Sequence, residues 1–494
     1  MAVQLYTSRV VLDKLGADDY GLYNVVGGVV GLLSFLTGTL SIGTSRFITY
    51  ELGAGDAKKL KSTFVTSFYT HLALSGIIVL LLETIGLWFF YNHLVIPNER
   101  LDAAFWVYQI SILTTIVAIT QVPYTSAIMA HEKMDIYAYL SIFEAVAKLL
   151  VVYLLAIAPY DNMLFYAILI AIVQIMLASF YRFFCVSKFQ ECSLNFSFDK
   201  SIFKKLMGFS GWNITANIAE VLKAQGVIVL INMFFQPAIV AAQAIGNQIT
   251  NAMMQFINNI RTAVNPQIIK LYASGDYEGS KRLTLKSSLY VFDLSLLIGL
   301  PFILLMEPVL NLWLKEVPPY TTLFAQYIVA SQIIANYYIS FYTPMMAANK
   351  IKKNSIAAVI FGFGYYFVLY VTLKLGGEVM WVQYLNVINM AIWSYIIKPY
   401  ILYKDINYNI PEMAKCIFYS LKVSLLSCVI AIPTRILLDN SLFECIILFI
   451  VTVLAVLLSS YIFMYNDDRK IVLAYVKKLI NNRRLNFRGV KKLS

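Results

Sequence analysis

The chain has 494 residues, of which 60% are apolar and only 13% are charged. Soluble proteins are about 45–50% apolar and about 25% charged, so this composition excludes a soluble globular protein, a disordered chain and a collagen-like fibre. The net charge is +12, but the basic residues gather in particular loops, which excludes nucleic acid as a partner. A membrane-spanning helix needs about 20 apolar residues. The sequence therefore predicts an all-α polytopic membrane protein.

Apolar runs, bounded by charges or by clusters of Pro, Asn and Gly, predict about fourteen membrane spans. The first run is too short to cross about 30 Å of hydrocarbon, and it carries Arg9 and Asp13. We therefore expect the natural chain to begin upstream, with Met1 inside a truncated first helix; a short, half-inserted helix is the alternative. The predicted spans cover roughly residues 1–15, 22–47, 63–90, 104–129, 136–158, 163–187, 207–235, 238–262, 284–313, 321–347, 355–375, 379–402, 413–435 and 442–465.

The Lys and Arg residues lie mostly on one side of the predicted membrane. Of the 39 basic residues, 29 lie on the side that carries the 48–62 loop, and five fall within spans. Cytoplasmic loops carry an excess of Lys and Arg, so that side is predicted to be cytoplasmic, together with both termini. The opposite side carries five basic residues: Lys14, Arg100, Lys315, Lys374 and Arg435.

The chain repeats itself at an offset of about 220 residues. Gly55-Asp56 matches Gly275-Asp276, and Tyr124-Thr125 matches Tyr342-Thr343 in the same order along the chain. Because the offset covers six spans, both copies keep the same orientation, which predicts two parallel six-helix bundles that rock against each other. The predicted parts are an N-terminal lobe (1–200), a C-terminal lobe (201–403), and two accessory helices with a basic cytoplasmic tail (404–494).

Residues of the types that carry enzymatic chemistry do not cluster in this sequence. The five cysteines show no CxxC spacing and the three histidines lie far apart, so no metal site is predicted. No acid–base motif is present either, which argues against a membrane glycosyltransferase or polymerase. We expect no cofactor and no enzymatic activity.

Four stretches carry a family pattern that is strongest over residues 5–160. They are LYTSRVVLDKLGADDYGLYNVVGGVVGLLSF, TSRFITYELG, LWFFYNHLVIPNER and TQVPYTSAIMAHEKMDIYAYLS. The first contains an LG-x-x-x-YG-x-YN element, formed by Leu15-Gly16, Tyr20-Gly21 and Tyr23-Asn24. In these stretches the chain resembles the Wzx-type polysaccharide flippases of the multidrug/oligosaccharidyl-lipid/polysaccharide (MOP, MATE-like) exporter superfamily.

The resemblance implies a function and a set of partners. It implies an alternating-access flippase that moves undecaprenyl-diphosphate-linked oligosaccharide across the bacterial cytoplasmic (inner) membrane, for assembly of O-antigen (lipopolysaccharide), capsule or exopolysaccharide. The implied partners are the lipid-linked oligosaccharide, membrane lipids, H+ or Na+ as a coupling ion, and polysaccharide polymerase machinery. The alternative is a cation-coupled multidrug exporter on the same scaffold.

Charged residues inside membrane spans are costly, so each is a candidate functional group. Three acid–base pairs have helical spacing, which places the two members on one face: Arg9 with Asp13, Glu144 with Lys148, and Glu220 with Lys223. Such pairs either join helices structurally or act on the substrate and the coupling ion. For Arg9 and Asp13 the resemblance favours the second reading, because the family places charged residues of its first helix towards the cavity.

Two arginines, Arg46 and Arg261, have no local acidic partner. Arg binds phosphate oxygens through two parallel hydrogen bonds, so a pair of guanidiniums suits a diphosphate; snorkelling to lipid headgroups is the alternative. The resemblance implies cavity arginines in the first, second and eighth helices. The predicted substrate-binding residues are Arg9, Arg46, Arg261, Lys223 and Lys148, and the predicted ion-coupling residues are Asp13, Asp293 and Glu220.

Overall fold

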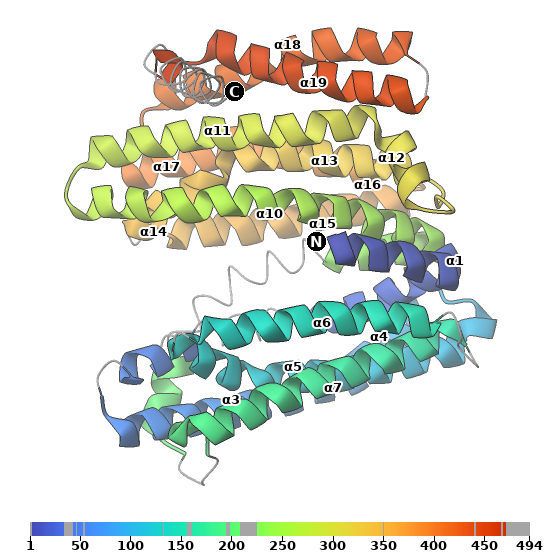
Figure 1. The fold of residues 1–494 in the computed structure, drawn as a ribbon, viewed down its shortest axis with the longest axis vertical. Coiled ribbons are helices and arrows are strands. Elements are labelled where there is room, and N and C mark those ends of the chain that lie inside the picture. Colours follow the sequence, from blue (N-terminus) through green and yellow to red (C-terminus); the bar gives the residue numbers. More distant parts are fainter. Residues whose placement is uncertain are drawn as a thin grey trace, which may run out of the picture. The chain divides into compact units, whose positions relative to one another are not determined.

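In the computed structural model, all regular secondary structure of the described residues is helical (Figure 1). The described residues are 2–33, 43–45, 47–52, 55–131, 133–155, 161–193, 198–207, 225–348, 350–438, 441–465 and 468–470. Eight helical segments in these ranges are long and apolar enough to cross a membrane. The prediction of an all-α polytopic membrane protein is confirmed, and the count of fourteen spans stays a prediction.

The described helices follow one another along the chain. Two segments, η1 (Leu82–Gly86) and η6 (Trp393–Ile397), are π-helical turns within longer helices. The α-helices are α1 (Ala2–Gly31), α3 (Ala57–Leu81), α4 (Leu87–His93), α5 (Leu101–Ala130), α6 (Met134–Leu155), α7 (Asn162–Lys188), α9 (Val227–Phe234), α10 (Pro237–Ala273), α11 (Tyr277–Leu304), α12 (Met306–Trp313), α13 (Thr321–Tyr338), α14 (Tyr342–Ala347), α15 (Lys352–Lys374), α16 (Trp381–Ile392), α17 (Lys398–Ile406), α18 (Ile410–Leu437) and α19 (Leu442–Phe463).

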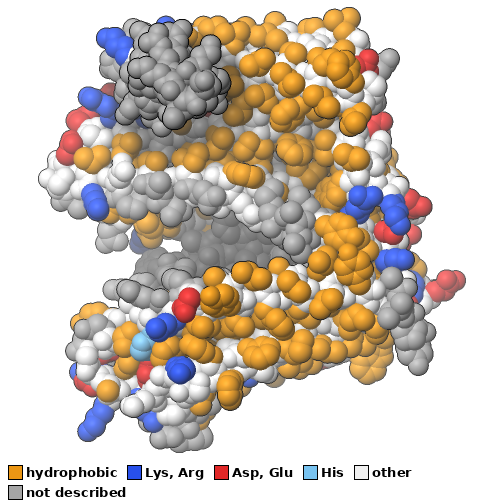
Figure 2. All heavy atoms as spheres, viewed as in Figure 1, with side chains coloured by type: hydrophobic (Ala, Val, Ile, Leu, Met, Phe, Trp, Pro, Cys, Tyr) orange, Lys and Arg blue, Asp and Glu red, His pale blue; other side chains and the backbone are white. Residues whose placement is uncertain are grey.

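The exposed faces of these helices are largely apolar, as lipid requires. In α15, only 11% of the most apolar stretch is buried, and a helix that is hydrophobic all round yet exposed is typical of a membrane span. Figure 2 shows hydrophobic side chains over most of the visible face of α6 and α7, with Lys and Arg mainly towards the helix ends. This distribution fits helices that cross a hydrocarbon layer.

Helix α1 is broken at Gly16, where the chain leaves the helical conformation with φ 78° and ψ 170°. Only glycine populates this region readily, because any Cβ would clash with the adjacent backbone. The sequence predicts a break between residues 15 and 22, and Gly16 lies within that interval. The two halves of α1 correspond to the first predicted span and the start of the second.

The internal repeat is visible in two matching turns. Gly55 and Gly275 both have positive φ, 74° and 85°, and each is followed by an aspartate that caps the next helix. Asp56 accepts a hydrogen bond from the backbone N–H of Lys59 at the start of α3, and Asp276 accepts one from Gly279 at the start of α11. The same glycine–aspartate pair therefore begins a long helix in each copy of the repeat.

The described residues form two compact units, each made of several chain segments. One unit combines residues 1–252, 309–328 and 350–390, and the other combines 253–308, 329–349 and 391–494. These units are defined by contacts in the structure, whereas the two sequential lobes and the accessory helix pair are predicted from the sequence repeat. That division stays a prediction. The first unit has a core of buried side chains from α1, α9, α10, α13 and α15, among them Val25, Ile231, Val240, Phe324 and Leu369.

In the second unit, the antiparallel helices α18 and α19 lie side by side and pack on α11 (Figure 1). Tyr419 of α18 donates a hydrogen bond to Asp293 of α11 over 2.8 Å. Ser427 and Thr452 are both buried, and each satisfies its hydroxyl by bonding to the carbonyl four residues earlier in its own helix. Polar side chains inside this bundle are thus mostly paired, as an apolar surrounding demands.

Candidate functional site

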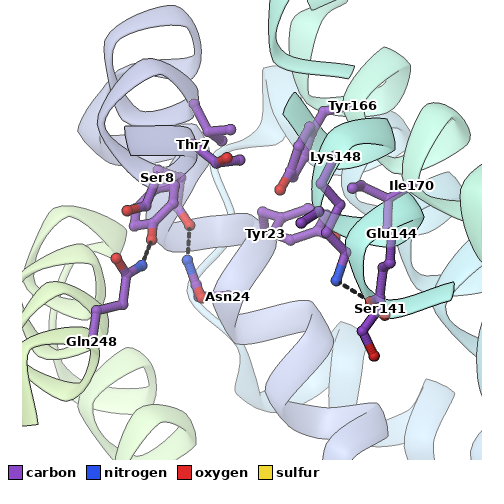
Figure 3. Close-up of a pocket in the computed structure, with 13 residues that line it drawn as sticks. Thr7, Ser8, Tyr23, Asn24, Ser141, Glu144, Lys148, Tyr166, Ile170 and Gln248 are labelled. Atoms are coloured by element: carbon purple, nitrogen blue, oxygen red, sulfur yellow. Dashed lines mark hydrogen bonds and ion pairs between the residues drawn. The ribbon is translucent and has the colours of Figure 1, made fainter. Parts of the chain in front are cut away.

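A cavity of about 490 Å³ lies within the first unit, between both halves of α1 and the helices α6, α7 and α10 (Figure 3). Its lining is mainly polar and aromatic, although the helices around it are apolar. Six of its residues matter most for the chemistry: Tyr20, Tyr23, Asn24, Glu144, Tyr166 and Gln248.

The second half of α1 supplies three neighbouring side chains on one helix face. Tyr20, Tyr23 and Asn24 have the i, i+3, i+4 spacing that brings side chains together on a helix, and all three line the cavity. The amide nitrogen of Asn24 donates to the carbonyl of Tyr20 over 2.7 Å, and Nε2 of Gln248 donates to the Tyr20 hydroxyl over 2.5 Å. Tyr20 therefore links α1 to α10.

Tyr23 and Tyr166 meet edge to face across the cavity wall. Their ring centroids are 5.0 Å apart and the ring planes cross at 62°, which is a favourable arrangement for two aromatic rings. Tyr166 belongs to α7, so this contact joins α7 to α1 beside the cavity (Figure 3).

Glu144 and Lys148 of α6 form the ion pair that their spacing predicts. Lys148 Nζ lies 2.6 Å from Glu144 Oε1, and each side chain is 37% exposed. Both residues line the cavity. The ion pair therefore lies within one helix and is also accessible to a ligand. The role of Lys148 in substrate binding stays a prediction.

Asp13 is paired differently from the expectation. Its carboxylate contacts Lys315 Nζ at 2.6 Å, and no ion pair joins it to Arg9 among the described residues. Their spacing places Arg9 and Asp13 on one face of the helix, but Asp13 forms its ion pair with Lys315, which is distant in sequence. Arg9 itself lies in α1 and is partly buried.

Arg261 lies in α10, in the second unit, where its guanidinium forms a hydrogen bond within its own helix. Nη1 donates to Asn258 Oδ1 over 3.0 Å, while the Nε is buried and has no hydrogen-bond partner among the described residues. No carboxylate in this part of the chain lies within ion-pair distance of Arg261. The role of Arg261 in substrate binding stays a prediction.

Asp293 of α11 is half-buried, and one of its two carboxylate oxygens makes no hydrogen bond among the described residues. Its Oδ2 accepts the hydrogen bond from Tyr419, and its Oδ1 is buried without a hydrogen-bond partner in the described structure. An oxygen of this kind can take up a proton or contact a cation. Three other predicted site residues, Arg46, Glu220 and Lys223, lie outside the described residues.

The cavity tyrosines and amides were not among the residues predicted from charge. Charges inside spans draw attention because they are costly, whereas Tyr, Asn and Gln are common in helices. A signal existed nevertheless: Tyr20, Tyr23 and Asn24 belong to the LG-x-x-x-YG-x-YN element that carries the family resemblance. Among the described residues, no group of three or more His, Cys, Asp or Glu is placed to hold a metal ion.

Comparisons with known proteins agree with this architecture. The MatE family model matches residues 3–154, a range that contains almost all of α1 and α6, two of the four helices around the cavity. A comparison with curated proteins found no match.

Several solved membrane transporters share the fold. The lipid II flippase MurJ, in an inward closed conformation, has a TM-score of 0.67 at 13% identity, with 94% of this chain and 98% of that chain covered. An inward-facing multidrug resistance MATE family transporter of the MOP superfamily has a TM-score of 0.62 at 16% identity, covering 81% of this chain and 95% of that chain. A MOP superfamily transporter from Pyrococcus furiosus has a TM-score of 0.51 at 14% identity, covering 81% and 98%.

The apolar helices and the shared architecture together describe a multi-pass membrane protein. The chain has the fold of the MOP-superfamily membrane transporters.

Proposed function

We propose that this protein flips a lipid-linked oligosaccharide across the bacterial cytoplasmic membrane, and that Arg261 contacts the diphosphate of the lipid carrier. The observation that carries the proposal is the environment of the Arg261 guanidinium. Its guanidinium lies at the end of a predicted span, with a buried Nε that has no hydrogen-bond partner among the described residues and with no described carboxylate beside it.

An arginine in this state is suited to an anionic ligand. A guanidinium offers five N–H donors in a fixed plane and remains charged at any accessible pH. A phosphate group accepts two of these hydrogen bonds in parallel, which satisfies the donors and neutralises the charge together. A cationic drug would be repelled at the same place, so Arg261 counts against the multidrug exporter.

The pattern of coverage gives further support. The match to MurJ, which is named as a lipid II flippase, covers 94% of this chain, whereas the match to the inward-facing MATE family transporter covers 81%. Helices α18 and α19 lie beyond the twelve spans of the predicted repeat. A chain that is covered almost to its full length by a lipid flippase is more readily understood as a lipid flippase than as a drug exporter.

The remaining features of the proposal extend the family resemblance. The substrate is an undecaprenyl-diphosphate-linked glycan for O-antigen, capsule or exopolysaccharide, delivered to polymerase machinery in the outer leaflet. Both termini face the cytoplasm. Of the proposed coupling residues, Asp293 has a free carboxylate oxygen and Asp13 is engaged by Lys315, so H+ or Na+ coupling is better placed on Asp293.

The test is to delete the gene in its native host and to restore it with Arg261→Ala or Arg261→Lys. Charge-assisted hydrogen bonds contribute about 1.5–3 kcal/mol each, so Arg261→Ala should lower surface polysaccharide about tenfold or more at normal protein abundance. Arg261→Lys should restore it only in part, because lysine keeps the charge and loses the two-pronged geometry. Arg435→Ala is the matched control, since the guanidinium of Arg435 donates to the nearby carbonyl of Leu438 and lies on the predicted outer side, away from the proposed site.

Two results would contradict the proposal. Full polysaccharide export by both Arg261 variants would remove the arginine from substrate binding. Loss of ethidium efflux in the same variants, with polysaccharide unchanged, would identify a multidrug exporter instead.

A further inference from the structure

We propose that the cavity between α1, α6, α7 and α10 binds a sugar unit of the transported glycan. This inference rests on the proposed function, which supplies a glycan as ligand, but it concerns different residues from Arg261. The first argument is the unusual lining. Ligand pockets usually hold only a few polar groups, whereas eight of the thirteen residues that line this one carry a hydroxyl, amide or phenol group.

The aromatic part of the lining suits the face of a sugar ring. Tyr23 and Tyr166 both line the cavity, and their edge-to-face contact fixes the two rings relative to each other. The face of an aromatic ring is negative and its edge positive. The C–H bonds on one face of a pyranose are weakly positive, so they pack favourably on a tyrosine ring, whereas a flat apolar drug has no need of the surrounding hydroxyls.

The polar part of the lining contains a hydrogen-bond acceptor in a fixed orientation, the side-chain oxygen of Gln248. Gln248 uses its Nε2 to donate to the hydroxyl of Tyr20, and this fixes the orientation of the amide (Figure 3). The Oε1 of the same amide is buried and has no hydrogen-bond partner among the described residues. A buried acceptor left unpaired costs free energy, and a sugar hydroxyl is a donor that would satisfy it.

The two charged side chains of the cavity, Glu144 and Lys148, neutralise each other, so the cavity does not favour a simple ion. Glu144 and Lys148 face each other at 2.6 Å, and each side chain is 37% exposed. Such a pair presents a carboxylate acceptor and an ammonium donor side by side with no net charge. Neighbouring hydroxyls of a sugar can donate to the first and accept from the second, whereas a cationic drug would have to displace the lysine.

The volume fits one part of a glycan. A cavity of about 490 Å³ lies within the range of about 300–1,000 Å³ that is usual for small-molecule sites. It is too small for a whole lipid-linked oligosaccharide. The cavity is therefore a subsite for a sugar, and it makes binding depend on the glycan as well as on the lipid diphosphate.

The test measures binding to the full-length protein in nanodiscs with defined lipids. The probes are undecaprenyl diphosphate alone and undecaprenyl diphosphate that carries N-acetylglucosamine, glucose or galactose. The wild-type protein is expected to bind at least one glycosylated form about tenfold more tightly than the bare lipid, which is the effect of one or two net hydrogen bonds. Gln248→Ala and Tyr166→Ala should bring that ratio close to one and leave the affinity for the bare lipid unchanged.

Two controls separate a binding effect from a folding effect. Tyr166→Phe keeps the ring that packs on the sugar, so it should retain most of the preference. Tyr139→Ala removes a tyrosine of α6 that is 69% exposed and does not line the cavity, so it should keep the full preference. Arg261→Ala should weaken binding of bare and glycosylated lipids by the same factor.

The outcomes distinguish this inference from the proposed function. Equal binding of the bare lipid and of all three glycosylated forms would overturn the sugar subsite and leave the lipid flippase intact. Failure of the wild-type protein to bind any of these lipids would overturn both proposals. Binding of ethidium that is lost in Glu144→Gln would overturn the sugar subsite and favour a drug exporter.

Discussion

Lys315 Nζ lies 2.6 Å from Asp13 Oδ2, so an ion pair joins the first half of α1 to the segment between α12 and α13. Both residues belong to the same compact unit, although they are 302 positions apart in the sequence. Lys315 is 61% exposed and Asp13 is 20% exposed. In the predicted topology, Asp13 and Lys315 lie on the outer side of the membrane and in different predicted lobes. Separation of these lobes on the outer side during transport would therefore require this ion pair to break.

The first prediction is that tying these two residues together stops transport. In a variant without native cysteines, Asp13→Cys and Lys315→Cys are joined by a short thiol cross-linker that contains a cleavable disulfide. Surface polysaccharide should fall sharply on cross-linking and recover on reduction, because the lobes cannot separate while the tether holds. Each single cysteine variant, treated in the same way, is the control. Undiminished export by the cross-linked protein would show that the contact does not open.

The second prediction concerns Arg100, which is held between two carboxylates. It forms ion pairs with Asp19 of α1 and Asp161 at the start of α7, and its Nε donates to Asp19 over 2.8 Å. Hydrogen bonds between charged groups contribute about 1.5–3 kcal/mol, so Arg100→Ala should lower the Tm of the purified protein clearly. Arg100→Lys should lower it less, since one cation remains between the two acids. Lys14→Ala, at an exposed position five residues before Asp19, is the control and should leave the Tm unchanged.

The third prediction is the pH dependence that this contact creates. Burial alone would raise the pKa of Asp161, but hydrogen bonds from Arg100 and from the backbone N–H of Leu164 outweigh burial and lower that pKa. A lowered pKa in the folded state gives stability that is present above the unfolded value of about 3.9 and is lost as the pH falls through the folded value. The Tm of the wild-type protein should therefore fall more steeply in acid than that of Asp161→Asn. Parallel curves for the two proteins would contradict this account.

The fourth prediction uses the two matching turns of the repeat. Replacing an N-cap aspartate with alanine costs about 0.5–2 kcal/mol, whereas asparagine caps almost equally well. Asp56→Ala and Asp276→Ala should each lower the Tm, and the corresponding Asn variants should stay close to wild type. A Tm that neither alanine substitution changes would mean that these two aspartate caps have no role in stability.

The fifth prediction is the orientation in the membrane. The excess of Lys and Arg on one side predicts that the loops at 92–98 and 315–319 face outwards. Reporter domains that are active only outside the cytoplasm, inserted in these loops, should be active, and the same domain inserted in the 48–62 loop should be inactive. A cytoplasmic signal from both outer loops would overturn the predicted topology.

The sequence predicted the helical architecture well because lipid imposes a simple rule. Every backbone polar group must be paired inside the segment, so long apolar runs become helices. The pairing of Glu144 with Lys148 was also predictable, since helical spacing alone places them together. The partner of Asp13 was not, because Lys315 approaches from a segment 302 positions away.

The cavity was harder to predict than the ion pairs. Its walls come from α1, α6, α7 and α10, and no local pattern states that these four helices meet around an open space. Tyr166 and Gln248 are ordinary residues of their own helices and gain significance only from neighbours on α1. Tyr20, Tyr23 and Asn24 did share a recognisable element, and for these three the chemistry could have been inferred from their common helix face.

The backbone conformation at Gly16 determines whether an L- or a D-amino acid can occupy this position. An ideal Cβ at this position would meet no neighbouring atom within 4 Å, so room is available for a larger side chain. The obstacle is the positive φ of 78°, whose mirror image is an extended conformation open to ordinary L-amino acids. A D-alanine introduced by chemical ligation would therefore fit where L-alanine is strained. Chirality, rather than space, makes glycine the one genetically encoded residue suited to this junction.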